Sequence, residues 1–197
     1  MKAVLSNRIY LSANKELMNR LERELTYTIA PRIPSDPPIV FKTFRYVREG
    51  LCSVPMGRED LIPSDYEIVD KRVVNEIEHP DFAYKLRPSQ QMAYDEVYDN
   101  SIINAWVSWG KTITALAIAA KLGQKTLVVT HTTNLRNQWE KEVKKSFGYT
   151  AGRIGSGMFN IDAPISVGNI QTLYRRMDVI KKEFGTLILD EMHHVSS

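Results

Sequence analysis

Hydrophobic and polar residues follow two different periods along the second half of the chain. Segments with a helical period are separated by short, nearly continuous apolar runs, which is the pattern of strands buried on both faces. The expected helices are residues 88–100, 111–122, 134–147 and 170–182. The expected strands are residues 101–107, 125–130, 165–168 and 186–189. Strands that alternate with helices of this length predict an α/β fold with a parallel sheet covered on both faces, and Trp139 and Leu173 are expected in its core.

The first 80 residues have a different pattern, in which short strand-like segments surround one amphipathic helix. Leu17, Leu21 and Leu25 form one apolar stripe on the expected helix 14–25, which Ser12 or Asn14 would cap. The expected strands are residues 5–11, 39–47, 51–55 and 66–69, and Glu49-Gly50 favours a hairpin turn between the second and the third. A proline-rich loop covers residues 31–38. We therefore expect a small α+β domain over residues 1–80 and an α/β domain over residues 81–197.

Composition narrows the class of protein only slightly. The chain has 197 residues and a formal net charge of +3, so its overall charge predicts no strong field for nucleic acid. Residues 1–80 carry 12 basic and 12 acidic side chains, whereas residues 81–197 carry 14 and 11. The single cysteine, Cys52, excludes an internal disulfide framework and is expected to be a buried apolar residue in a reducing compartment. No stretch has the apolar length of a membrane span, so no membrane partner is expected.

Gly110-Lys111-Thr112 lies between an expected strand and an expected helix, which is the context of a phosphate-binding loop. Backbone N–H groups and the helix N-terminus would face phosphate oxygens, with Ser108 and Trp109 completing the loop. Lys111 would reach the β- and γ-phosphates of ATP, and the Thr112 hydroxyl would bind Mg²⁺. Ala105 replaces the first glycine of the usual pattern and Trp109 is bulky, so an ordinary helix start with a solvated lysine is the alternative.

Two carboxylates follow the last expected strand, at the edge of an α/β sheet where ligands bind. Asp190 would hold Mg²⁺ directly or through water, because this ion takes few carboxylates and keeps several waters. Glu191 would then orient or deprotonate the attacking water, which makes Lys111, Asp190 and Glu191 the candidate catalytic residues. The alternative is a pair of surface charges after a strand. The adjacent His193 and His194 lack a spaced third ligand and are a poor zinc site.

The phosphate-loop and Asp-Glu segments together resemble superfamily 2 helicases of the DExH type. Three further segments match that family in the right order: Leu86-Arg87-Pro88-Ser89-Gln90, residues 127–135 followed by Gln138-Trp139, and residues 167–173. Ser89 and His131 depart from the family's usual aromatic residue and proline. The resemblance implies a RecA-like parallel sheet, that is, an incomplete first helicase lobe of the P-loop NTPase type.

The resemblance also implies roles for individual residues. Leu86-Arg87-Pro88-Ser89-Gln90 resembles the family's adenine-binding segment, in which Arg87 and Gln90 would contact the nucleotide, and His193 would couple ATP hydrolysis to movement. The residues expected to touch the nucleic-acid backbone are Thr132, Gly168, Gln171 and Thr172. The likeness is closest to phage helicases of the T4 and T5 type that remodel branched DNA. It implies ATP and Mg²⁺ as cofactors, branched or duplex DNA as partner, a role in DNA repair and recombination, and the cytoplasm of the host cell as location.

In that family a strand between the phosphate-loop strand and the Asp190 strand comes later in the sequence, and a second lobe supplies arginine fingers. Such fingers are typically worth about 10³–10⁵ in rate. We therefore expect residues 1–197 to be a fragment of a longer helicase, with a gap in its sheet, without processive unwinding and with little ATPase activity.

Basic and aromatic residues alternate on the expected strand 39–47 and just beyond it, namely Lys42, Phe44, Arg45, Tyr46 and Arg48. Bases could stack on the rings while the cations meet phosphates. The alternative is a set of core aromatics beside solvated charges. Two other functions stay open for the whole protein: a motor that moves on duplex DNA without unwinding it, and a non-enzymatic nucleic-acid-binding module.

Overall fold

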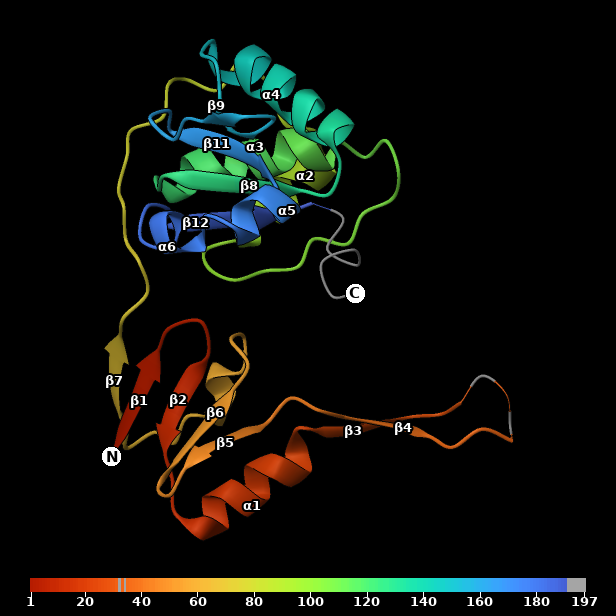
Figure 1. Ribbon diagram of the computed structural model, residues 1–197, viewed down its shortest axis with the longest axis vertical. Helices are drawn as coiled ribbons and strands as arrows, with labels where there is room; N and C mark the ends of the chain where they lie inside the picture. The colour runs from red at the N-terminus through yellow and green to blue at the C-terminus, as the bar shows by residue number, and fades with distance from the viewer. Residues whose placement is uncertain (32, 34, 191–197) are drawn as a thin grey trace. The chain divides into compact units, whose positions relative to one another are not determined.

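The computed structural model describes residues 1–31, 33 and 35–190, which form two compact units, Met1–Arg72 and a second unit that begins at Val73 (Figure 1). The sequence predicted a boundary at residue 80. Residues 73–79 belong with the second unit because their backbone bonds to it: the Lys125 N–H donates to the Asn75 carbonyl at 2.8 Å and the Ile77 N–H to the Gly123 carbonyl at 2.9 Å. Among the described residues, no helix is long and apolar enough to cross a membrane.

The first unit is built on a five-stranded sheet with the order β5-β6-β2-β1-β7. The strands are β1 (Lys2–Leu5), β2 (Ile9–Ser12), β5 (Arg45–Arg48), β6 (Leu51–Val54) and β7 (Glu67–Asp70). Neighbouring strands are antiparallel except β1 and β7, which are parallel. The expected hairpin at Glu49-Gly50 is confirmed between β5 and β6, where Gly50 has a φ of 72°.

The prediction of one continuous strand over residues 5–11 is wrong, because the chain turns at Ser6-Asn7-Arg8 to form the β1–β2 hairpin. The Ser6 N–H donates to the Arg8 carbonyl at 3.0 Å, and the Arg8 guanidinium donates to Ser53 Oγ on β6 at 2.9 Å. These three polar residues interrupt the apolar alternation, and turns favour such residues.

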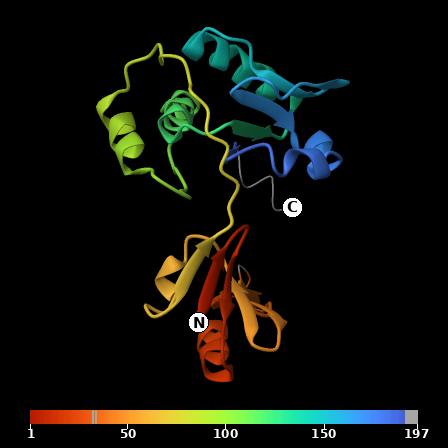
Figure 2. The same cartoon turned by 90° about the vertical axis from the view of Figure 1, so that its left-hand side faces the viewer.

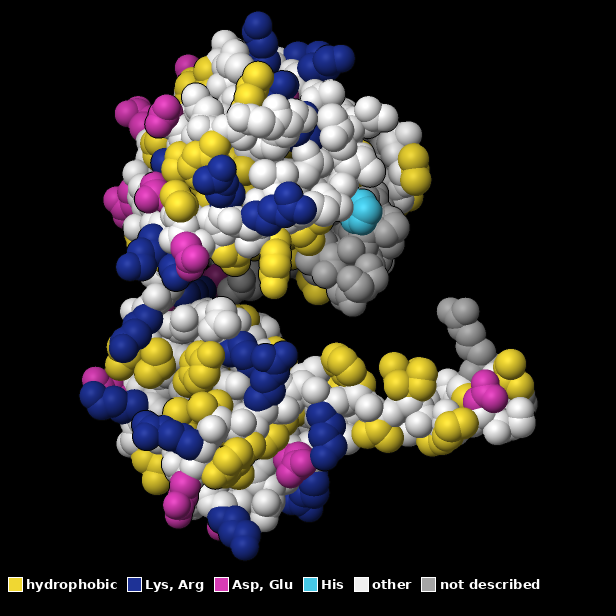
Figure 3. All heavy atoms as spheres, in the orientation of Figure 1, with side chains coloured by type: hydrophobic (Ala, Val, Ile, Leu, Met, Phe, Trp, Pro, Cys, Tyr) yellow, Lys and Arg dark blue, Asp and Glu magenta, His cyan; other side chains and the backbone are white. Residues whose placement is uncertain are grey.

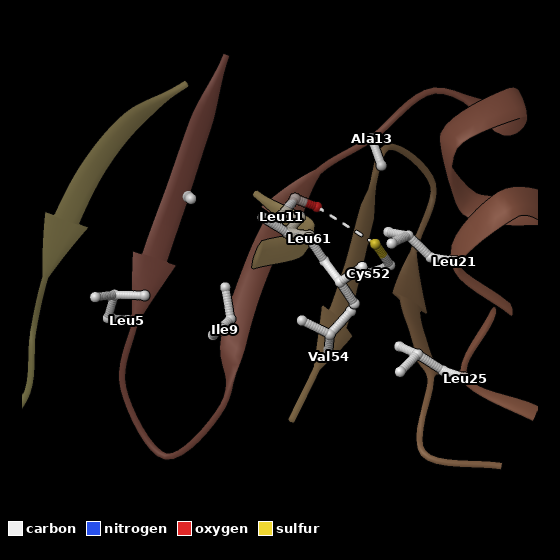
Figure 4. Close-up of a cluster of buried hydrophobic side chains, with 10 residues drawn as sticks. Leu5, Ile9, Leu11, Ala13, Leu21, Leu25, Cys52, Val54 and Leu61 are labelled. Atoms are coloured by element: carbon white, nitrogen blue, oxygen red, sulfur yellow. Dashed lines mark hydrogen bonds between the residues drawn. The ribbon is translucent and has the colours of Figure 1, made fainter. Parts of the chain in front are cut away.

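Helix α1 (Lys15–Glu24) packs its apolar stripe on this sheet. Asn14 is the N-cap, as predicted, and its Oδ1 accepts the Leu17 N–H at 2.8 Å. Leu21 and Leu25 point toward β6 and join a buried cluster that contains Cys52 and Val54 (Figure 4). The Cys52 thiol donates to the Leu11 carbonyl at 3.8 Å, and burial raises the pKa of Cys52 to about 11. Cys52 is therefore the buried apolar residue that the sequence predicted.

The expected strand 39–47 is wrong as one element, because its two halves belong to different sheets. Strands β3 (Thr26–Ile29) and β4 (Ile39–Lys42) have no other strand partner among the described residues and form a two-stranded ribbon that extends away from the five-stranded sheet (Figure 1). The chain leaves this ribbon at Thr43, and Phe44 packs against the core of the unit. Hydrophobic side chains line the ribbon (Figure 3), and Tyr27, Ile29 and Phe41 are exposed. The short 3-10 helix η1 (Glu59–Leu61) follows β6.

The second unit contains the expected sheet, with the order β10-β9-β11-β8-β12. The strands are β8 (Thr126–Thr130), β9 (Gly152–Gly155), β10 (Met158–Phe159), β11 (Ile165–Asn169) and β12 (Thr186–Leu189). All pairings are parallel except that of β9 with β10, which confirms the α/β class. Strands β9 and β10 were not predicted, because their sequence is rich in glycine and lacks a clear apolar period.

Helices cover both faces of this sheet (Figures 1 and 2). On one face α3 (Lys111–Leu122) and α4 (Thr133–Phe147) place Leu116, Trp139 and Val143 against β8 and β11. On the other face α5 (Ile170–Tyr174) and α6 (Met177–Ile180) place Leu173 and Ile180 against β8. The predictions of Trp139 and Leu173 as core residues are therefore confirmed.

Two expected helices are shorter or broken. Helix α2 (Pro88–Glu96) ends four residues before the expected residue 100. The Asn100 N–H donates to Asp99 Oδ1 at 2.7 Å, and such local side-chain bonds compete with a helix. The expected helix 170–182 is interrupted at Arg175-Arg176, which separates α5 from α6.

The expected strand 101–107 is wrong, because residues 101–106 form no helix or strand. Within residues 1–31, 33 and 35–190, β12 pairs with β8 alone, so its other edge is open and Leu187 is 58% exposed. A strand forms only where a neighbour satisfies its backbone groups. The apolar run 101–107 has no such neighbour among the described residues, and Ile102 and Val107 are exposed.

His79 lies in the second unit with its ring against Phe147, at a centroid distance of 5.8 Å. Its Nε2 lies 3.2 Å from the Gln124 carbonyl, and its buried Nδ1 has no hydrogen-bond partner among the described residues. Burial lowers the pKa of His79, so the unfolded state takes up the proton at a higher pH than the folded state.

We expect the second unit to lose stability as the pH falls through about 6.5, the ordinary histidine value, and to go on losing it down to the lowered pKa of the folded state. His79→Gln should flatten this dependence, because glutamine carries no proton to gain. Urea unfolding of both proteins at several pH values between about 5 and 8 measures it. Parallel curves for the wild type and His79→Gln would show that His79 does not cause the loss.

Candidate nucleotide-binding site

Gly110-Lys111-Thr112 forms the start of α3, as the sequence predicted. Gly110 is the N-cap with a left-handed φ of 95°, and Lys111 is the first helical residue. Ser108 also has a positive φ, 66°, so the backbone turns sharply just before the helix. The Lys111 ammonium donates to the Ala105 carbonyl at 3.2 Å, within its own loop. The helix N-terminus therefore has the N–H groups and the adjacent cation that a phosphate requires.

The segment Leu86-Arg87-Pro88-Ser89-Gln90 contacts this loop directly. The Trp109 carbonyl accepts hydrogen bonds from the Arg87 guanidinium and, at 3.0 Å, from Gln90 Nε2. Gln90 is 3% exposed, and its Oε1 accepts the Arg87 N–H at 2.8 Å. A Cβ added at Gly110 would lie 2.4 Å from Gln90 Nε2, so glycine is required for this approach. The structure thus brings together Arg87, Gln90, Trp109 and Gly110.

Two departures from the helicase pattern contact each other. Trp109 is buried beside the loop, and its Nε1 donates to Ser89 Oγ at 3.1 Å. A serine in place of the usual aromatic ring leaves a hydroxyl that accepts from the bulky tryptophan. The sequence alone gave no sign of this pairing, because the two residues lie 20 positions apart.

Asp190 directly follows β12 at the carboxyl end of the parallel strands. Its N–H donates to the Val129 carbonyl at 3.2 Å, and its Oδ2 accepts from Trp139 Nε1 at 2.7 Å. Among the described residues, Lys111 bonds to Ala105 and Asp190 to Trp139, and no ion pair joins Lys111 to Asp190. The predicted Glu191, the predicted coupling residue His193 and the neighbouring His194 lie outside the described residues.

The residues predicted to meet nucleic acid lie at or just beyond the carboxyl ends of β8 and β11, which are neighbours in the sheet. Thr132 is the N-cap of α4, and its Oγ1 accepts the Leu135 N–H at 3.2 Å. Gly168 is buried, and a Cβ there would lie 2.7 Å from Leu173 Cδ2, so this glycine lets α5 pack on β11. Gln171 is exposed and Thr172 half-buried on α5.

Arg136 organises the same edge of the sheet, and sequence reasoning missed it. It is 2% exposed and donates to Asn169 Oδ1 on β11 at 2.9 Å and to Ser156 Oγ at 3.1 Å. Glu140 lies 3.5 Å from Arg136 Nε and also pairs with Arg153 on β9. The spacing of Arg136 and Glu140, four residues apart on a helix, was the available signal. This cluster ties α4 to the ends of β9 and β11.

The chemistry of these side chains suits a magnesium nucleotide better than a structural metal. A hydroxyl at Thr112 and a carboxylate at Asp190 are oxygen donors of the kind that Mg²⁺ takes, with waters completing its shell. Among the described residues there is no cluster of three or more His, Cys, Asp or Glu side chains that could hold a metal by itself.

A left-handed glycine before a helix, a strand-end aspartate and a parallel sheet define a RecA-like lobe, the nucleotide-binding architecture of superfamily 2 helicases. The chain belongs to that superfamily, since residues 83–197 match the family model described as the res subunit of the Type III restriction enzyme.

Two curated relatives agree with this membership. The chain is similar to the Probable helicase D10 of Escherichia phage T5, with 42% identity over 198 residues that cover 98% of this chain and 44% of the relative. It is also similar to the DNA 3'-5' translocase XPB2 of Sulfurisphaera tokodaii, with 34% identity over 88 residues, 45% of this chain and 20% of the relative. The chain therefore spans less than half the length of these relatives.

Proposed function

We propose that the chain binds Mg-ATP and forms the nucleotide-binding part of an ATP-driven motor that acts on branched DNA. The observation that supports this most strongly is the meeting of Arg87 and Gln90 with the carbonyl of Trp109. It joins the segment implicated in adenine binding to the loop implicated in phosphate binding. Membership of the helicase superfamily supplies the expectation of ATP hydrolysis.

In this proposal each side chain has one task. Lys111 leaves the Ala105 carbonyl and pairs with the β- and γ-phosphates, while the N–H groups at the start of α3 bind phosphate oxygens. Thr112 and Asp190 hold Mg²⁺, which neutralises phosphate charge when bound. Glu191 orients the attacking water and His193 couples hydrolysis to movement. Thr132, Gly168, Gln171 and Thr172 lie at or just beyond the strand ends where the nucleic-acid backbone would pass.

Two assays on the whole protein test the proposal. Strand displacement from forked DNA that requires ATP is expected for a helicase acting on branched DNA. Displacement of a triplex-forming strand without unwinding would favour a duplex translocase, a candidate that the restriction-enzyme family match and the translocase relative support. Binding of DNA with no binding of Mg-ATP would contradict both and leave a non-enzymatic binding module.

In the first unit, fewer of the residues that the sequence suggested for DNA binding remain available for contact. Lys42 lies on the ribbon and pairs with Glu22 at 2.8 Å, while the half-buried Phe44 packs against the core. Arg45, Tyr46 and Arg48 remain exposed on β5, an edge strand of the sheet. We propose that these three β5 side chains contact DNA, with the ring of Tyr46 available for stacking.

The double variant Arg45→Glu, Arg48→Glu is expected to weaken binding of forked DNA and to lower the slope of log K against log salt by about 2, one unit for each lost phosphate contact. Binding is measured by fluorescence anisotropy at several salt concentrations. Arg20→Glu, Arg23→Glu on the exposed face of α1 carries the same charge change and should shift the slope far less. Equal effects of the two double variants would mean that only net charge matters.

A further inference from the structure

Trp139 and Asp190 form a hydrogen bond at the edge of the sheet where the nucleotide is expected. The indole Nε1 lies 2.7 Å from Asp190 Oδ2. Trp139 comes from the middle of α4 and is 3% exposed, whereas Asp190 follows the last residue of β12. The two residues are 51 positions apart in the sequence, so the fold alone brings them together.

The ring of Trp139 has a fixed position. It packs in one buried cluster with Leu116 of α3, Val128 of β8 and Val143 of its own helix. Leu116 lies on the helix that begins with Lys111 and Thr112. One buried cluster therefore joins the phosphate-loop helix and the sheet to the tryptophan that bonds to the aspartate.

The hydrogen bond constrains the carboxylate. An indole N–H can only donate, and a buried one requires an acceptor. A carboxylate acceptor makes the bond charge-assisted, and such bonds are shorter and stronger than neutral ones. Asp190 Oδ2 is thereby held, and no residue of the described part of the chain donates a hydrogen bond to Oδ1, so Oδ1 is the oxygen left for a cation or its water.

We propose that Trp139 is a positioning residue for magnesium: its N–H orients the Asp190 carboxylate so that Oδ1 receives Mg²⁺ or a water bound to it. This inference rests on the proposed function, since it requires Asp190 to serve the metal. Partners that orient a metal ligand typically change metal affinity about 10–100-fold when they are removed. A tryptophan that only filled the core would have no such effect.

Trp139→Phe tests the proposal, because it removes the N–H and keeps a large aromatic ring. Binding of a fluorescent ATP analogue to the chain is measured while Mg²⁺ is titrated, and again in EDTA. We expect the Mg²⁺ concentration at half-saturation to rise about 10-fold. Binding of the analogue in EDTA should stay within about twofold of the wild type, because a phenylalanine leaves the phosphate loop and the adenine segment in place.

Three further variants test whether a change in the Mg²⁺ midpoint comes from the contact between Trp139 and Asp190. Phe147→Leu disturbs the same buried cluster without touching Asp190, so it should lower the melting temperature and leave the Mg²⁺ midpoint unchanged. Tyr174→Phe removes a hydroxyl from an exposed aromatic side chain outside the phosphate loop and should change neither. Asp190→Asn should itself raise the midpoint, and adding Trp139→Phe to it should have no further effect, since the two residues act through one contact.

These measurements test the positioning role of Trp139 and the metal-binding role of Asp190 separately. A raised midpoint for Asp190→Asn with an unchanged midpoint for Trp139→Phe would overturn the positioning role and leave the proposed function intact. An unchanged midpoint for Asp190→Asn would overturn the metal-binding role of Asp190, and the positioning role with it. Equal weakening of analogue binding by Trp139→Phe with and without Mg²⁺ would show that the tryptophan serves packing alone.

Discussion

Lys111→Ala is expected to weaken Mg-ATP binding by about 10–150-fold, the range that corresponds to losing one hydrogen bond to a charged group, about 1.5–3 kcal/mol. The physical reason is that the Lys111 ammonium stands at the N-terminus of α3, where it adds a full positive charge to the N–H groups that we propose bind the phosphates. The measurement is a titration of the chain with a fluorescent ATP analogue in the presence of Mg²⁺.

The Lys111→Ala substitution should leave the fold intact. The Lys111 side chain is half-buried, and its partner among the described residues is a carbonyl of its own loop, Ala105. The melting temperature should therefore change little. Lys141→Ala removes an exposed lysine from α4 and serves as the matched control, with binding close to that of the wild type. Wild-type affinity in Lys111→Ala would support the alternative of an ordinary helix start with a solvated lysine.

The parallel sheet could be predicted from the sequence because its buried strands carry their own signal. Residues 126–130 and 165–169 are buried at every position, and a continuous apolar run flanked by helices indicates such strands. The start of α3 after Gly110 could also be predicted, since a glycine before a helix start needs no distant residue to be recognised. The observed bounds of α3, α4 and β12 agree with the predicted bounds to within one residue.

The remaining differences depend on contacts that a linear pattern does not contain. Residues 101–107 have the composition of a strand, yet a strand also needs a neighbour, and the open edge of β12 has none among the described residues. The sequence predicted Thr43-Phe44 as part of one strand over residues 39–47. In the structure Phe44 packs against the core, and the residues before and after it belong to two different sheets, in β4 and β5. The bonds of Trp109 to Ser89 and of Trp139 to Asp190 likewise arise only when the chain folds.

Gly110→Ala is expected to cause a second large loss, this time of stability. Gly110 has a φ of 95°, a conformation that costs an L-residue about 1–2 kcal/mol. The new Cβ would also lie 2.4 Å from Gln90 Nε2. Gln90 is buried and cannot move without losing its bonds to the Trp109 carbonyl and the Arg87 N–H, and a buried polar group without a partner costs about 1–3 kcal/mol.

These two effects predict that Gly110→Ala lowers the free energy of unfolding of the second unit by about 2–5 kcal/mol. All three tryptophans, at positions 106, 109 and 139, lie in that unit, so urea unfolding followed by tryptophan fluorescence reports on it alone. Gly123→Ala at the other end of α3 is the matched control: its φ is 62° and the nearest atom to its Cβ, the Ile77 carbonyl oxygen, is 4.0 Å away. It should lose only the conformational part, about 1–2 kcal/mol. Equal losses in the two variants would mean that Gln90 yields freely, and that the adenine segment does not hold the phosphate loop in place.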